Sequence, residues 1–151
     1  MTDTPQLSGV MPHLTCKDAA GAIDFYKRAF GATEIMRLPD KNGLLMHAAL
    51  TMNGAIVMLM DEYPEYGSLS PKTIGGTAVV LHLQVADVDQ AFAKAVAAGA
   101  TAVMPVGDMF WGDRYGQVED PYGHRWSIAT TLKQLSPDQI MQNLRDMEQP
   151  A

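Results

Sequence analysis

The sequence has a single cysteine, little basic charge and no long apolar run. Cys16 is the one cysteine among 151 residues, which excludes an intrachain disulfide framework and favours a cytoplasmic location. Lys and Arg number 11 against 17 Asp and Glu, giving a net charge of −6, so we expect neither a nucleic-acid partner nor an anionic membrane surface. Apolar stretches such as residues 55–60 are too short to span a bilayer. Residues 1–10 lack a basic region and an apolar core, so no signal peptide is expected.

Apolar residues, in contrast, are plentiful. They make up 47% of the chain, which at this length supplies a core for one domain over residues 1–151. Methionine is unusually frequent, with 11 residues. Its flexible, polarizable side chain fills core gaps and also suits adaptable apolar binding surfaces.

The chain contains two copies of one unit. Residues 13–18 read His-Leu-Thr-Cys-Lys-Asp, and residues 82–87 read His-Leu-Gln-Val-Ala-Asp. Each copy continues into an Ala-rich amphipathic stretch that ends in Gly-Ala-Thr, at residues 31–33 and 99–101. Two such copies in a short chain typically pack about a pseudo-twofold axis. We therefore expect a ligand cleft between them.

Periodicity predicts the order β-α-β-β-β for the first repeat, about residues 9–62. Asp18 is a suitable cap for its helix, and Asn53-Gly54 is typical of a tight hairpin. Its strands are predicted at residues 10–16, 33–38, 44–52 and 55–60. Residues 63–76, rich in Pro, Gly and Ser, are predicted to be a linker that contains Tyr63 and Tyr66 and could act as a lid over the cleft.

The same order is predicted for the second repeat, about residues 77–131. Its helix begins after Asp87, and residues 120–123 form a turn. Its strands are predicted at residues 77–86, 101–105, 114–119 and 125–130. A C-terminal helix over residues 136–148 opens with the capping box of Ser136 and Gln139. Its thin apolar stripe is expected to pack on the domain or on a partner subunit.

These units carry phrases that resemble the vicinal-oxygen-chelate superfamily, which includes glyoxalases, bleomycin-resistance proteins and extradiol dioxygenases. The phrases are AIDFYKRAFGA at residues 22–32, WGDRYG at 111–116 and DPYGH at 120–124. Shorter stretches at residues 46–48, 70–71 and 110–114 are similar to the PhnB-like branch. The resemblance implies an α+β fold with two βαβββ repeats that form a pair of half-barrels, plus the C-terminal helix. It also implies a homodimer, with or without exchange of repeats between chains.

In enzymes of this superfamily, His or Glu residues on the first and last strand of each repeat hold a divalent metal. The resemblance carries these four positions onto Met11, Met58, Val80 and Ser127. None of these side chains is a usual ligand for such a metal. No metal cofactor is therefore expected, and the usual glyoxalase or dioxygenase mechanism is in question.

The histidines offer an alternative. His13 and His82 are equivalent in the two repeats, each two residues beyond the expected ligand position. Because side chains alternate along a strand, a shift of two keeps them on the cavity side. A divalent metal held by His13 and His82 would make the protein a lyase, isomerase or dioxygenase. His47 is either a strand histidine bonded to a neighbour or a polar anchor or general base, whereas His124 is expected to be exposed in a turn.

The stretch Phe110-Trp111-Gly112-Asp113-Arg114-Tyr115 is the other candidate for ligand contact. Trp111 offers a flat apolar face for stacking on a planar ligand. Arg114 either clamps a carboxylate or phosphate or pairs with a neighbouring acid, namely Asp113, Glu119 or Asp120.

The sequence thus predicts a protein that binds a small, planar, partly apolar molecule between its repeats, without the usual metal ligands. The runner-up is a metal-dependent enzyme that uses His13 and His82. The catalytic candidates are His13, His47 and His82. The expected ligand-binding residues are Met11, His13, His47, Met58, Met60, His82, Phe110, Trp111, Arg114 and Ser127.

Overall fold

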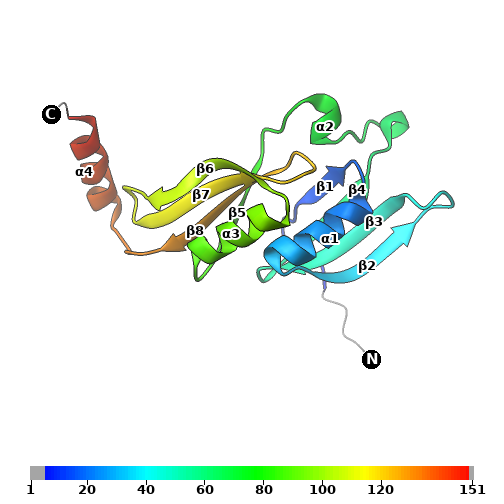
Figure 1. The fold of residues 1–151 in the computed structure, drawn as a ribbon, viewed down its shortest axis with the longest axis horizontal. Helices are drawn as coiled ribbons and strands as arrows, with labels where there is room; N and C mark the ends of the chain where they lie inside the picture. Colours follow the sequence, from blue (N-terminus) through cyan, green and yellow to red (C-terminus); the bar gives the residue numbers. More distant parts are fainter. Residues whose placement is uncertain (1–5, 150–151) are drawn as a thin grey trace.

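The computed structural model describes residues 6–149 and confirms the α+β fold with two βαβββ repeats and a C-terminal helix (Figure 1). The first repeat comprises β1 (His13–Cys16), α1 (Ala19–Phe30), β2 (Thr33–Pro39), β3 (Leu45–Met52) and β4 (Ala55–Asp61). The second comprises β5 (Val80–Gln84), α3 (Val88–Ala98), β6 (Thr101–Asp108), β7 (Asp113–Glu119) and β8 (Arg125–Thr131). The 3-10 helix η1 (Pro64–Tyr66) and α2 (Pro71–Ile74) lie between the repeats, and α4 (Pro137–Glu148) follows them. The expected absence of a signal peptide concerns in part residues 1–5, which lie outside the described residues.

Each repeat folds into one four-stranded sheet, and the two sheets have equivalent strand orders, β1-β4-β3-β2 and β5-β8-β7-β6. In both sheets the first strand runs parallel to the last one. The register is also equivalent, since His13 lies opposite Met58 and His82 lies opposite Ser127. The two histidines therefore occupy the same place in the two sheets.

The helices begin and end where their sequence signals predict. The carboxylate of Asp18 accepts a hydrogen bond from the backbone N–H of Gly21, and that of Asp87 accepts one from the N–H of Gln90. Gly31 ends α1 in the left-handed conformation, at φ 68°, where a side chain would be strained. Both amphipathic helices then bury one face against their own sheet.

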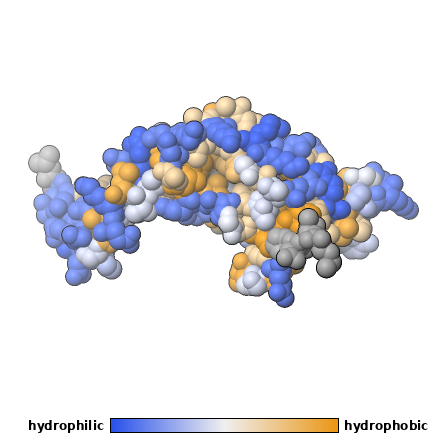
Figure 2. Space-filling view, turned by 90° about the horizontal axis from the view of Figure 1, so that it is seen from below, coloured by the Kyte–Doolittle hydropathy of each residue, from blue (hydrophilic) through white to orange (hydrophobic). Residues whose placement is uncertain are grey.

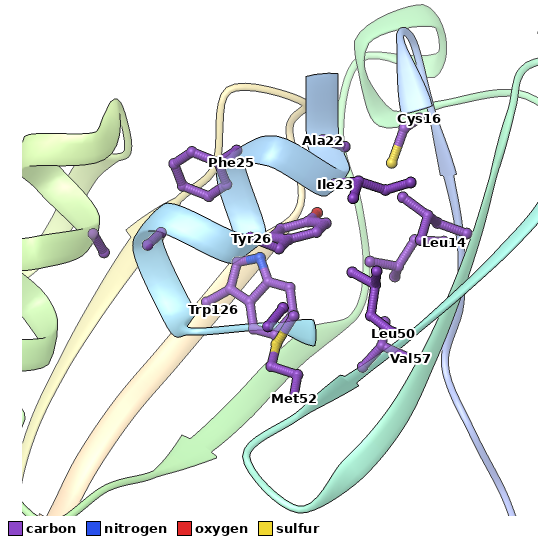
Figure 3. Packing of buried hydrophobic residues seen from close by; sticks show 14 of the residues in the cluster. Leu14, Cys16, Ala22, Ile23, Phe25, Tyr26, Leu50, Met52, Val57 and Trp126 are labelled. Carbon is purple, nitrogen blue, oxygen red and sulfur yellow. The ribbon is translucent and has the colours of Figure 1, made fainter. Parts of the chain in front are cut away.

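The two repeats share a core. Helices α1 and α3 lie on the same side of the sheets and contact each other (Figure 1). Close to this contact, Tyr26 of α1 lies beside the indole of Trp126 on β8, and Met52 of β3 lies next to the indole (Figure 3). The rings of Tyr26 and Trp126 are 5.4 Å apart, and those of Phe30 and Trp126 are 4.8 Å apart. The apolar surface of one repeat is thus covered by the other.

Strand ends differ from the prediction by three residues in three places, and by one or two residues elsewhere. Strand β1 begins at His13 rather than at residue 10, because Pro12 has no N–H to donate, although its carbonyl still accepts from Met58. Strand β5 begins at Val80 rather than at residue 77, after a turn in which Thr77 Oγ1 accepts from the N–H of Val79. Strand β6 continues to Asp108 rather than ending at residue 105, since register shifts let it keep pairing with β7.

Helix α4 lies at the far end of the molecule (Figure 1). Its capping box forms as predicted, with reciprocal bonds between Ser136 and Gln139. It is tied to the second repeat by a hydrogen bond from Asn143 Nδ2 to the carbonyl of Phe110, 3.0 Å long. None of the helices in residues 6–149 has the length and apolar character needed to cross a membrane.

Candidate functional site

Each sheet has one side packed on its helix and one side open. In the first repeat, Leu14, Val57 and Leu59 are buried in the core, whereas the side chains that alternate with them face away from α1. We call this side the first open face; it carries His13, Thr15, His47, Ile56, Met58 and Met60. The matching side of the second sheet is the second open face; it carries His82, Gln84, Tyr115, Gln117, Glu119, Arg125 and Ser127.

The molecule is hollowed along one side. Figure 2 shows the hollow between the protruding C-terminal helix and the bulk of the first repeat. Helices α1 and α3 lie on the other side of the sheets (Figure 1). A smaller cavity of about 210 Å³ lies at the first repeat, lined by Met46, Met60, Tyr63, Tyr66 and Ser68. The two linker tyrosines therefore lie beside Met60, at the margin of the first open face.

Two of the predicted histidines meet on the first open face. The rings of His13 and His47 are 5.6 Å apart and nearly perpendicular. This contact joins β1 and β3 across β4, where Met58 lies opposite both His13 and Ala49. Burial, followed by the neighbouring His47, lowers the pKa of His13 below its ordinary value of 6.5. At neutral pH the His13 imidazole is therefore uncharged, which suits apolar surroundings formed by methionines.

The third histidine belongs to a hydrogen-bonded chain on the second open face. His82 Nδ1 is 2.7 Å from the hydroxyl of Ser127, and His82 Nε2 is 2.9 Å from Gln84 Oε1. An amide oxygen only accepts, so Nε2 is the donor to Gln84, and in a neutral imidazole Nδ1 then accepts from Ser127. Gln84 Nε2 then donates to Thr131 Oγ1 over 2.8 Å. The imidazole is thus held in one orientation by bonds to both of its nitrogens.

Trp111 connects to this chain through an aromatic contact. Its ring lies edge-on to Tyr115 at 5.4 Å, and Tyr115 in turn stacks on His82 at 6.3 Å. The indole N–H donates to Asp113 Oδ2, and the ring of Phe110 lies edge-on to Trp111 at 5.1 Å. The structure therefore brings Phe110 and Trp111 to the end of the second open face.

Arg114 lies on the other side of the same strand. Its guanidinium donates to Asp89 of α3 and to Asp108 of β6, at 2.8 to 3.1 Å. These bonds raise the pKa of Arg114. Since Arg114 and Tyr115 are consecutive in a strand, they point to opposite faces. The structure thus does not bring Arg114 together with His82 and Trp111.

Met11 is the remaining predicted ligand contact, and Val80 is its equivalent in the second repeat. Met11 precedes β1 and lines a separate hollow of about 430 Å³ with Val10, Pro12 and Ile56. The register places His13, rather than Met11, opposite Met58. It likewise places His82, rather than Val80, opposite Ser127.

The expectation that His124 is exposed is wrong. The residue is 9% exposed, and its Nε2 lies 2.9 Å from the carbonyl of Thr15 in β1. The turn faces inward because of Asp120, which was predicted to be a turn residue and a possible partner of Arg114. Asp120 is 1% exposed, and its carboxylate accepts hydrogen bonds from Tyr26, Trp126 and two backbone N–H groups. The DPYGH phrase, which includes Asp120, was the available signal.

Comparison with known proteins identifies the family. The model of the Glyoxalase/Bleomycin resistance protein/Dioxygenase superfamily matches residues 8–128. The chain belongs to this superfamily. An uncharacterized protein of Mycobacterium tuberculosis is 49% identical over 132 residues, covering 85% of this chain and 78% of that protein.

Solved structures agree with this membership of the superfamily. TioX from Micromonospora sp. ML1 is 30% identical, with a TM-score of 0.64, and the match covers 85% of this chain and 100% of TioX. The PhnB protein from Bacillus cereus shares the fold at 22% identity, with a TM-score of 0.65 and coverage of 82% and 99%. At this identity the likeness shows the shared fold, and the PhnB-like branch stays a prediction.

The metal that the superfamily implies does not fit the residues found here. Within residues 6–149, no three His, Cys, Asp or Glu side chains gather as a metal site requires. The register positions supply His13 with Met58 and His82 with Ser127, a set that contains no carboxylate. His82 also has both ring nitrogens engaged, by Ser127 and by Gln84. Such a donor set departs from the three or four His, Cys and carboxylate ligands typical of a metal centre.

Proposed function

We propose that the protein binds a small, planar, partly apolar molecule in the cleft between its two repeats, without the usual metal ligands. This proposal rests on the side chains that the two open faces present. At the family's ligand positions they hold Met58 and Ser127, beside histidines that are neutral or hydrogen-bonded. A surface of this kind suits contact with an apolar ring and hydrogen bonds to a few polar groups.

The expected affinity comes mainly from apolar contact. Burying about 200 Å² of apolar ligand surface against Met58, Met60 and Trp111 would contribute roughly 5 kcal/mol, before the entropy of association is subtracted. The half-buried methionines adapt to ligand shape because their thioether chains have several rotatable bonds. The hydrogen-bonded chain from Ser127 to Gln84 would set the orientation of polar groups on the ligand.

The test is the substitution Trp111→Ala, with Trp111→Phe as the matched control that retains a flat ring. Binding of a panel of planar antibiotics and aromatic acids is measured by calorimetry, and unfolding by thermal denaturation. We expect Trp111→Ala to weaken binding about tenfold or more, with a smaller effect on folding, and Trp111→Phe to retain most of the affinity. Unchanged affinity in Trp111→Ala would contradict the role of this side chain.

The second candidate function is a metal-dependent enzyme that uses His13 and His82. The equivalent register of the two histidines, each beside the last strand of its sheet, favours it. The metal content of tag-free protein and titration with Ni²⁺, Zn²⁺ and Mn²⁺, followed by tryptophan fluorescence, decide between the two functions. One tightly bound metal per protomer that is lost in His13→Ala or His82→Ala would make the enzyme the leading function. No saturable response would retire it.

We also propose a homodimer. Several large apolar side chains around the first open face and its outer strand are exposed, namely Met36, Leu38, Leu44 and Met46. A second copy that covered them would also close the cleft. Light scattering over a range of concentrations is the measurement, and a monomer at all concentrations would contradict the proposal.

A cytoplasmic location is proposed from the single buried thiol of Cys16, and cell fractionation tests it.

A further inference from the structure

The guanidinium of Arg125 differs from those of two other arginines in the sheets. Arg114 donates to two carboxylates, and Arg37 donates twice to Glu34. In Arg125, by contrast, Nε is buried and has no hydrogen-bond partner among residues 6–149. Its ion-pair partner Glu119 is 3.9 Å away, beyond hydrogen-bond distance. The surroundings of Arg125 therefore leave most of its donors unengaged.

The position of Arg125 in the second sheet is the second observation about this side chain. It is the first residue of β8, opposite Val80 on one side and Glu119 on the other. Strand alternation puts it on the second open face with Ser127, two residues further along. The preceding residue, His124, bonds to the carbonyl of Thr15 in β1. Arg125 therefore lies where the second open face meets the first repeat.

The two open faces differ in chemistry although the repeats share one architecture. At equivalent positions of the last strand, the first face presents Ile56, Met58 and Met60, whereas the second presents Arg125, Ser127 and Ala129. A ligand that contacts both faces would place its apolar part on the methionines. Its polar part would then lie on the side where Arg125 is found.

We propose that Arg125 anchors an anionic oxygen group of the ligand, a carboxylate or a phosphate. The inference rests on the proposed function and names the chemical class of ligand for that site. The side chain of Arg125 is 41% exposed, so its terminal nitrogens are accessible to a ligand. A guanidinium without intramolecular bonds presents parallel N–H donors that match two oxygens of such a group. Glu119, 38% exposed and only loosely paired, is the side chain that the anion displaces.

The experiment compares three probes that share one flat ring: 2-naphthoate, 2-naphthyl phosphate and the uncharged 2-naphthamide. Affinities are measured by calorimetry for the full chain. We expect at least one anionic probe to bind about tenfold more tightly than the amide, and whichever of the two binds better identifies carboxylate or phosphate. Arg125→Gln should abolish this preference, and Arg125→Lys should retain part of it, since Lys keeps the charge but lacks the planar fork.

Two further variants control for charge. Arg114→Gln removes a positive charge from the opposite face of the neighbouring strand and should leave the preference unchanged. Glu119→Gln removes the competing carboxylate and should strengthen binding of the anionic probes. Binding of all three probes with equal affinity would overturn the role of Arg125 and leave the ligand-binding function in place. Binding of none would contradict the ligand-binding function itself and the anchor with it.

Discussion

The hydroxyl of Tyr26 donates a 2.6 Å hydrogen bond to the carboxylate of Asp120, and this bond joins the helix of the first repeat to the last turn of the second. The same oxygen of Asp120 accepts from the indole N–H of Trp126, at 2.9 Å. Both Tyr26 and Asp120 are almost completely buried. A buried carboxylate of this kind is tolerated only because its oxygens are fully hydrogen-bonded.

The substitution Asp120→Asn should therefore destabilise the protein strongly. An amide group presents an NH₂ to side chains and backbone groups that themselves donate, so about half of the hydrogen bonds are lost in a buried place. We expect a loss of roughly 3 kcal/mol in the free energy of unfolding, measured by urea denaturation. The exposed Asp24, on the same helix as Tyr26, provides the control Asp24→Asn, which should have little effect. Equal effects of the two substitutions would show that the buried bonds contribute little.

The same bond predicts how stability changes at alkaline pH. Burial, followed by the charge of Asp120, raises the pKa of Tyr26 well above its usual value of 10.0. The folded state therefore retains a proton that the unfolded chain releases, so stability falls as the pH rises above about 10. Tyr26→Phe should flatten this fall, whereas Tyr66→Phe, at a residue that is 82% exposed, should not. Urea unfolding at pH 8, 10 and 11 is the measurement, and parallel curves for all three proteins would refute the prediction.

The contact between His13 and His47 predicts that the pKa of His13 depends on its neighbour. Burial and the neighbouring imidazole both keep the pKa of His13 below 6.5. Replacing the neighbour in His47→Gln removes the second cause but not the first, so the pKa of His13 should rise only part of the way. Ring-proton NMR between pH 4 and 8 measures it, with His82→Gln as the control, since His82 lies on the other sheet. A His13 midpoint that stays the same in His47→Gln would show that burial alone lowers the pKa.

Gly112 predicts how the Trp111 loop responds to a single added carbon. The residue has φ +103°, and a Cβ atom there would lie 2.3 Å from the carbonyl oxygen of Lys133. Gly112→Ala should therefore lower the free energy of unfolding by roughly 2 kcal/mol or more and change the fluorescence of Trp111. Gly43 also has a positive φ, of +87°, but a Cβ atom added there would have no other atom within 4 Å. Gly43→Ala thus reports the backbone strain alone, about 1 kcal/mol. The difference in unfolding free energy between the two variants gives the cost of the clash between the added Cβ atom and the Lys133 carbonyl oxygen.

Local sequence signals were sufficient for the fold. The two repeats, the helix caps at Asp18 and Asp87 and the capping box at Ser136 were all predicted and are confirmed. They could be predicted because caps and periodicity depend on residues only a few positions apart. The strand ends were less accurate, since pairing with a neighbouring strand decides how far a strand continues.

The arrangement of the site depends on contacts between distant residues, so the sequence predicted it less well. His13 meets His47 only because β4 lies between β1 and β3 in the sheet. The partners of Arg114 include Asp89 of α3, a residue that no local pattern connects to it. His124 was expected to be exposed because turns usually are, and only the buried carboxylate of Asp120 explains why this turn faces inward.

The shared core has a consequence for the history of the two repeats. By their equivalent positions, Tyr26 corresponds to Ala95 and Trp126 corresponds to Val57. The large aromatic pair therefore exists on one side of the pseudo-twofold axis, and a pair of small residues takes its place on the other. The halves have ceased to be interchangeable: a chain made of two first repeats would lack the indole that Tyr26 packs against. Whatever symmetry an ancestral duplication had, the present molecule depends on the order of its halves.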